Sequence, residues 1–247
     1  MSGYEIAFIL LGATAGGLIN GLAGTGTALF ALGFLLVVLE PISAVAIVTL
    51  MSVVTGMMGL WEVRVAMTYN VARLMRFILP GLAGVPVGLM LLAHIDADML
   101  KLLIAALLIL YGGFFTFRAN LPKFEKRTPV LDAGVGLSGG ILAGMAGLSG
   151  ALAVIWCSMR PWPKAETRAL LQPFNVAILG TTTAGLLWRG AYTPETVTAF
   201  LIALPASLIS AQIGLYAFRR VSDTLFRRLL IGLSLLLGLG ILINVLL

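Results

Sequence analysis

The sequence predicts an all-α polytopic membrane protein built from two inverted repeats of five segments each, with eight to ten membrane segments. Three observations carry this prediction. Hydrophobic residues make up 60% of the 247 residues and charged residues only 11%, whereas soluble domains contain about 45–50% and about 25%. Apolar runs near the length that a helix needs to cross a bilayer fill nearly the whole chain. A glycine-rich motif inside these runs occurs twice.

Ten apolar segments follow one another along the chain. They cover residues 4–22, 26–39, 43–61, 74–93, 99–117, 131–147, 150–159, 168–187, 196–217 and 225–247. The second and the seventh are short, because as helices they would reach about 21 and about 15 Å, less than the roughly 30 Å of a bilayer core. We therefore expect these two segments to be half-helices that follow a break.

The repeated motif reads GGLINGLAGTGTAL at residues 16–29 and GGILAGMAGLSGAL at residues 139–152. After a shift of 123 residues, seven of the fourteen positions are identical. Each copy has a turn of small residues in its middle, where backbone N–H and C=O groups leave the helix in a region without water. A repeated apolar segment broken by glycine indicates the binding site of a transporter.

A second match, between residues 88–112 and 214–238, extends the repeat beyond the glycine motifs. It predicts a first inverted repeat over residues 1–120, a basic linker loop over 121–127 and a second inverted repeat over 128–247. Since each copy has five segments, an odd number, the second copy must run inverted in the membrane. Corresponding loops also differ in charge, as inversion requires: HIDAD is acidic, whereas its counterpart RRVSD follows a further arginine and is basic.

The distribution of Lys and Arg indicates how the chain crosses the membrane. If the chain turns back at each glycine motif, 14 of the 16 Lys and Arg lie on one side, whereas merging the paired segments gives eight on each side. The positive-inside rule therefore favours the turn. It places both termini outside the cytoplasm of a bacterial inner membrane. Re-entrant hairpins and full crossings give the same count, so both remain open.

With these features in place, the chain resembles the sulfite exporter TauE/SafE family of membrane transporters over essentially its full length. The two glycine motifs resemble the paired Gly-rich segments of that family, each followed by a proline turn, here at Pro41 and Pro161. Thr25 and Thr27 interrupt the glycines of one copy and Ser149 those of the other. The resemblance implies outward movement of sulfite, sulfoacetate or a related organosulfonate, and it does not fix which one.

The candidate substrate-binding residues are those that offer donors near the two turns. A broken helix presents free N–H groups at the start of its second half, and the helix dipole favours an anion there. One cradle comprises Gly24, Thr25, Gly26 and Thr27, the other Gly147, Leu148, Ser149 and Gly150, and three amide side chains at membrane depth complete the set: Asn20, Gln172 and Asn175. Tight helix packing is the alternative for the glycines, and hydrogen bonding between helices is the alternative for the amides.

For a further set of hydroxyl groups there are two alternatives: they line the same cavity, or they bond to carbonyls of their own helix. These residues are Thr49, Ser52, Thr55, Thr181, Thr182 and Thr183. No Lys or Arg lies within either glycine motif. We therefore expect the helix dipoles to carry most of the attraction for an anion, and the basic residues to anchor loops at the membrane edges.

Other classes of function fit less well. All ten acidic residues fall at or near segment ends, so we expect no carboxylate relay and favour efflux driven by the membrane potential. Gly147–Gly150 spells G-x-S-G, as in an intramembrane serine hydrolase at Ser149, but such a serine needs a base and the single histidine, His94, lies at a membrane edge.

We expect no enzyme, no cofactor, no metal and no nucleic acid. The lipid bilayer and a small anion are the expected partners. A homodimer stays open, and a non-transporting subunit of a larger complex is the alternative.

Overall fold

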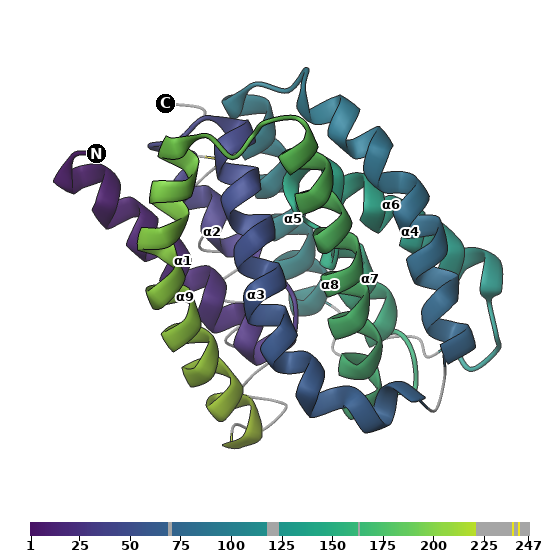
Figure 1. Cartoon of the computed structure of the whole chain (residues 1–247). Coiled ribbons are helices and arrows are strands. Elements are labelled where there is room, and N and C mark those ends of the chain that lie inside the picture. Colours follow the sequence, from purple (N-terminus) through teal and green to yellow (C-terminus); the bar gives the residue numbers. More distant parts are fainter. Residues whose placement is uncertain (69–70, 118–123, 163, 221–238, 240–241, 243–247) are drawn as a thin grey trace.

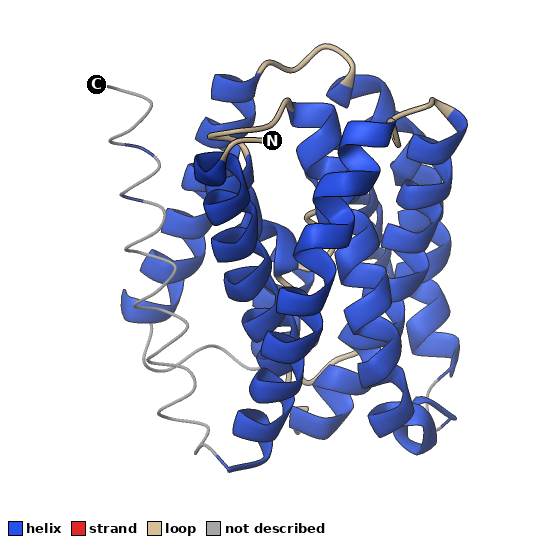
Figure 2. Ribbon diagram, turned by 60° about the vertical axis from the view of Figure 1, so that its left-hand side comes forward, coloured by secondary structure: helices blue, strands red, loops and turns tan. Residues whose placement is uncertain are grey.

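The computed structural model describes the chain except residues 69–70, 118–123, 163, 221–238, 240–241 and 243–247. The described part is a bundle of α-helices without strands (Figures 1 and 2). The helices are α1 (Gly3–Ala23), α2 (Thr27–Leu35), α3 (Pro41–Thr68), α4 (Val71–Leu92), α5 (Ala97–Phe117), α6 (Pro129–Ala146), α7 (Ala151–Ser158), α8 (Lys164–Trp188) and α9 (Pro194–Arg220).

The predicted all-α polytopic class is confirmed. Six described helices contain stretches long and apolar enough to cross a membrane: Gly3–Ala23, Pro41–Leu60, Val71–Leu92, Pro129–Ala146, Glu166–Trp188 and Pro194–Phe218. The expected segments agree with helices α1 to α9 to within a few residues at most ends. The main difference is at the end of α3, which continues to Thr68 although hydropathy falls after residue 61. The last expected segment, 225–247, lies outside the described residues except for Leu239 and Leu242.

The helix breaks expected at the two glycine motifs are present. Helix α1 is followed by its cap Gly24, with φ of 77°, and helix α6 by its cap Gly147, with φ of 67°. Only glycine adopts this left-handed conformation without strain, and it is a common way to end a helix. Each N–H donates back to a carbonyl of the helix that ends, over 2.8 Å. The helices that follow, α2 and α7, have nine and eight residues and at about 1.5 Å per residue are too short to cross a bilayer.

Glycines before the breaks bring pairs of helices into backbone contact. A methyl group on Gly21 of α1 would lie 2.0 Å from the carbonyl oxygen of Ala211 on α9, and one on Gly140 of α6 would lie 1.9 Å from that of Gly81 on α4. Small residues allow this closeness in membranes, where helices associate by packing. The packing interpretation of the glycines therefore holds for these positions, which precede the breaks rather than form them.

The core between these pairs holds the short helices. Helices α3 and α8 lie side by side near the centre of the bundle (Figure 1). Helix α5 covers α2 and α7 and turns a fully buried face towards the interior, formed by Leu100, Ile104, Ala105 and Leu108. The two breaks are thus enclosed by protein on several sides, as unpaired backbone at membrane depth requires.

Gly140→Ala should destabilise the bundle by about 1–3 kcal/mol or more, because the added methyl group overlaps the backbone of α4. Gly134→Ala is the matched control on the same helix. A methyl group there meets nothing within 4 Å, so we expect no loss of stability. Thermal unfolding of the purified variants in detergent measures the difference, and equal midpoints for the two variants would contradict the close contact between α4 and α6.

Candidate functional site

The two helix breaks meet inside the bundle. We call residues 24–26 the first break and residues 147–150 the second break. A methyl group added to Gly150 would lie 2.0 Å from Oγ1 of Thr25, and one added to Gly147 would lie 3.4 Å from Cβ of Ala28. The two cradles expected from the sequence therefore form a single location, although about 120 residues of chain separate them.

Asn175 of α8 joins the two breaks. Thr25 donates its hydroxyl to Oδ1 of Asn175 over 3.3 Å, and Ser149 donates its hydroxyl to the same oxygen. The Asn175 side chain is almost completely buried, and its Nδ2 has no hydrogen-bond partner among the described residues. A buried donor without an acceptor costs about 1–3 kcal/mol, so this amide can offer its N–H groups to a ligand oxygen.

Backbone donors surround the same point. The N–H groups of Thr25, Gly26, Ser149 and Gly150 make no hydrogen bond within the described part of the chain. The hydroxyl of Thr27, at the start of α2, is buried and has no described partner either. The first turns of α2 and α7 begin here, so the positive ends of two helix dipoles lie at the breaks. The arrangement is rich in donors, which is the chemistry that an oxyanion needs.

Asn20 and Gln172 occupy a neighbouring pocket rather than this meeting point. Asn20 donates its amide to Oγ1 of Thr55, and Gln172 donates its amide to the carbonyl of Gly56 over 2.8 Å. Both side chains line a narrow, partly open pocket between α1, α3, α8 and α9. The carbonyl oxygens of both amides are buried and have no described partner. Leu148, the remaining expected residue, is buried in the hydrophobic core.

Most of the further hydroxyl groups bond to their own helix. Each hydroxyl donates to a backbone carbonyl three or four residues earlier, over 2.7–3.0 Å: Thr49 to Ala46, Ser52 to Val48, Thr55 to Met51, Thr181 to Ala177 and Thr182 to Ile178. Thr55 alone of these residues also lines the pocket of Asn20 and Gln172. Thr183 has a buried hydroxyl without a described partner.

Arg168 is a candidate residue that the sequence analysis missed. It is only 5% exposed and lines the same pocket. Its guanidinium donates to the carbonyls of Gly21, over 3.1 Å, and Leu22, over 3.5 Å, in the last turn of α1. The expectation that basic residues only anchor loops is wrong here, because α8 begins at Lys164 and places Arg168 one turn inside the helix. Its spacing of four residues from Gln172, which puts both on one helix face, was the available signal.

The two ends of the bundle are held together by different chemistry. At one end Arg160 pairs with Asp132 over 3.1 Å with both side chains buried, and Arg73 pairs with the partly exposed Glu166. At the other end hydrogen bonds without an acidic partner connect the helices: Tyr192 donates to the carbonyl of Ala46 and Thr196 to Ser43, each over 3.1 Å, and Arg189 donates to the carbonyl of Leu89 over 2.6 Å. Among the described residues no group of three or more His, Cys, Asp or Glu side chains could hold a metal ion.

The comparisons with known proteins agree with this architecture. The family described as sulfite exporter TauE/SafE has a sequence model that matches residues 8–241. The chain belongs to that family. A relative from Cupriavidus necator, named a probable sulfite/organosulfonate exporter TauE, is 30% identical over 166 residues, which cover 64% of this chain and 62% of the relative. The match thus spans less than two thirds of the relative's length. No solved structure is found to match this TauE/SafE family member.

The contact between the breaks of this TauE/SafE family member predicts a strong coupling between two positions. Gly150→Ala alone should be destabilising, because its methyl group would overlap Oγ1, Cβ and Cγ2 of Thr25. Adding Thr25→Gly removes those three atoms, so the double variant should regain about 0.5–3 kcal/mol relative to the sum of the single effects. A double-mutant cycle of unfolding free energies measures this coupling, and additive effects would show that the two breaks do not touch.

Proposed function

We propose that this protein exports a small sulfur-containing anion, namely sulfite, sulfoacetate or a related organosulfonate, by alternating access. The observation that carries the proposal is the meeting of two helix breaks at Asn175, where buried donors lack acceptors. Membership of the TauE/SafE family and the name of the relative support the class of anion.

The anion binds between the two breaks. Its oxygens accept hydrogen bonds from the amide of Asn175 and from the backbone N–H groups of both breaks, which no described group satisfies. The dipoles of α2 and α7 add positive potential from two directions. A trigonal or tetrahedral oxyanion suits donors that converge from several elements, because each of its oxygens can accept more than one hydrogen bond. The residues of this site are Gly24, Thr25, Gly26, Thr27, Gly147, Leu148, Ser149, Gly150 and Asn175, with Asn20 and Gln172 beside it.

The two halves, residues 1–120 and 128–247, act as inverted repeats around this site. Their helices pair reciprocally: the first helix of each half packs on the fourth helix of the other, as α1 on α9 and α6 on α4. The third helices, α3 and α8, pack on each other. This exchange is what an approximate two-fold axis in the membrane plane produces, and it puts the substrate where the halves meet. Rocking of one half against the other would then open the site to each side in turn.

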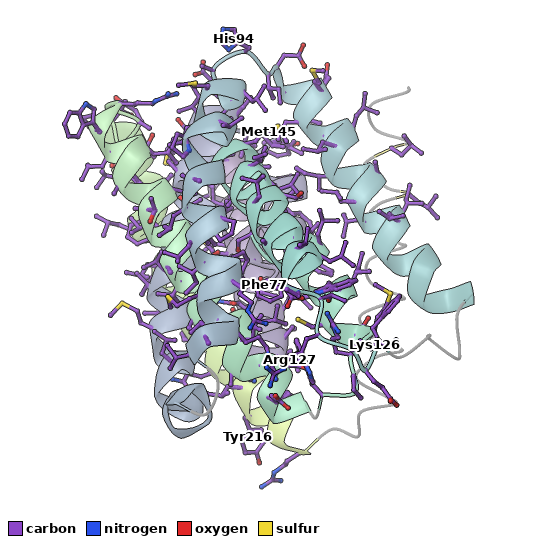
Figure 3. All side chains as sticks on the ribbon, turned by 90° about the vertical axis from the view of Figure 1, so that its right-hand side faces the viewer. Phe77, His94, Lys126, Arg127, Met145 and Tyr216 are labelled. Atoms are coloured by element: carbon purple, nitrogen blue, oxygen red, sulfur yellow. The ribbon has the colours of Figure 1, made fainter. Side chains whose placement is uncertain are left out.

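The orientation follows from charge. Figure 3 places His94 at one end of the bundle and Lys126, Arg127 and Tyr216 at the opposite end. The end that carries Lys126 and Arg127 faces the cytoplasm of a bacterial inner membrane, in keeping with the positive-inside rule. The N-terminus then lies outside, at the end of the bundle that carries His94 (Figures 2 and 3).

An enzymatic role for Ser149 has less support. Its hydroxyl donates to an amide oxygen, and an amide is not the base that a serine nucleophile needs. Membership of a transporter family points the same way. A non-transporting role as a subunit is tested directly by measuring flux with the purified protein.

Flux into proteoliposomes tests the transport proposal. The wild-type protein should move sulfite or a sulfonate with saturable kinetics. Asn175→Leu should lower that flux at least tenfold, because one unpaired or missing charge-assisted hydrogen bond costs about 1.5–3 kcal/mol. Thr181→Ala is the matched control, since its hydroxyl lies on the same helix but is exposed and bonds only to Ala177. Absence of flux for every sulfur anion would refute the proposed function, and unchanged flux in Asn175→Leu would place the site elsewhere.

The driving force can be measured in the same vesicles. Movement of one net charge through 100 mV is worth about 2.3 kcal/mol. We therefore expect outward flux of a sulfonate to rise when the compartment that contains it is made negative. Equal flux at zero and at negative potential, with equal sulfonate gradients, would rule out efflux driven by the potential and would indicate a compensating ion.

A further inference from the structure

The narrow pocket between α1, α3, α8 and α9 lies about one helical turn before the first break. Asn20 of α1 and Gln172 of α8 line it, and these side chains are only 2% and 1% exposed. The interior has room for about one water molecule, so a sulfonate does not fit. Apolar side chains form part of the wall, namely Met58, Ala211 and Leu215.

Existing hydrogen bonds fix which end of each amide is available. Asn20 uses its Nδ2 to donate to Oγ1 of Thr55, whose own proton goes to the carbonyl of Met51. Gln172 uses its Nε2 to donate to the carbonyl of Gly56. Turning either amide round would place an oxygen against an oxygen and lose that bond. The available groups are therefore the two amide oxygens, which accept and cannot donate.

These two oxygens need a donor. Within the described residues neither Oδ1 of Asn20 nor Oε1 of Gln172 has a hydrogen-bond partner. A buried acceptor left unpaired destabilises the state that contains it, so such groups are normally satisfied by protein or by ordered water. Buried waters typically make two to four hydrogen bonds to polar groups of this kind. The two side chains line the same small space, so one molecule can serve both.

The size and chemistry of the space select its occupant. Water carries two O–H donors, one for each oxygen, and the partly open mouth of the pocket gives it a way in. A sulfur oxyanion is too large, and its oxygens would face two further acceptors. Cations such as calcium and magnesium prefer six or more oxygen ligands, and a wall that is partly apolar does not provide them.

We propose that one buried water molecule occupies this pocket, donating one hydrogen bond to Oδ1 of Asn20 and the other to Oε1 of Gln172. The water joins α1 to α8, whose side chains otherwise bond here to Thr55 and Gly56 of α3. This inference goes beyond the proposed function and does not depend on it, because the water site requires no anion.

The water site lies where it can fix the end of α1. The backbone carbonyl of Asn20 accepts the N–H of Gly24, the residue that caps α1, over 2.8 Å. A methyl group on Gly24 would lie 2.6 Å from Oε1 of Gln172. Three residues after Gln172, Asn175 accepts hydrogen bonds from both breaks. The water therefore helps to hold the last turn of α1 against the helix that carries Asn175.

An experimental map of the full-length wild-type protein that resolves ordered water in its interior tests the position directly. We expect one peak within about 2.5–3.0 Å of both amide oxygens, the usual range for O–H···O hydrogen bonds. The absence of that peak, where other buried waters are resolved, would overturn the inference. A peak surrounded by six oxygens would overturn it too, because it would be a cation.

A double-mutant cycle measures the energy of the link. Asn20→Leu and Gln172→Met each take one acceptor from the water, and the double variant removes both acceptors and the need for the water. The combined loss should therefore be smaller than the sum of the single losses, by about two- to 140-fold in the equilibrium constant for unfolding. Chemical unfolding of the purified protein in detergent gives these constants. Additive losses would overturn the inference.

Thr182→Val supplies the matched control for the cycle. Thr182 is also buried on α8, but it donates to the carbonyl of Ile178 in its own helix. It lies ten residues beyond Gln172, or about 15 Å along the helix axis. Asn20→Leu and Thr182→Val should therefore be additive, and equal coupling in this pair would count against the water. Both experiments are made without substrate, so a failure to find transport leaves their outcomes unchanged.

Discussion

The rest of the structure depends on one constraint: backbone groups that leave a helix at membrane depth must be satisfied without lipid contact. This chain leaves the helix twice, at Gly24 and at Gly147. Both breaks are buried, and α5, α3 and α8 surround the short helices that follow them. The architecture can be understood as the enclosure of two defects in otherwise regular helices. Burial keeps lipid away from the free N–H groups while leaving them unpaired with protein.

Close helix contact makes that enclosure possible. The glycines of α1 and α6 that precede the breaks let α9 and α4 approach to backbone distance. The same motif therefore has two parts with different roles. Its first glycines pack, as at Gly17 and Gly140, whereas its last residues form the turn. Close packing therefore accounts for the first glycines of the motif, whereas anion binding at its last residues is the proposal made above.

Much of the fold could be predicted because it follows from local patterns. Length and hydropathy located the helices, and the glycine turns located the breaks. The site was harder to predict, because its composition depends on which helices meet. Asn175 lies at the junction of the breaks while Gln172, three residues earlier, bonds to α3, and this difference depends on which elements pack against α8 at each position. Arg168 and Asp132 lie near segment ends, where sequence suggests water, yet the packing of neighbouring helices buries them.

The unequal chemistry at the two ends of the bundle has a consequence for how the protein responds to its medium. In the proposed alternating-access cycle, opening one end between the two halves separates Arg73 from Glu166, whereas opening the other end breaks the hydrogen bonds of Tyr192, Thr196 and Arg189. Dissolved salt weakens attraction between exposed charges and leaves neutral hydrogen bonds nearly unaffected. In that proposed cycle, ionic strength acts on the balance between the two open states through the end that carries the partly exposed Glu166. Under the proposed orientation, a change of salt concentration in the cytoplasm would thereby change the fraction of time that the protein spends open towards it.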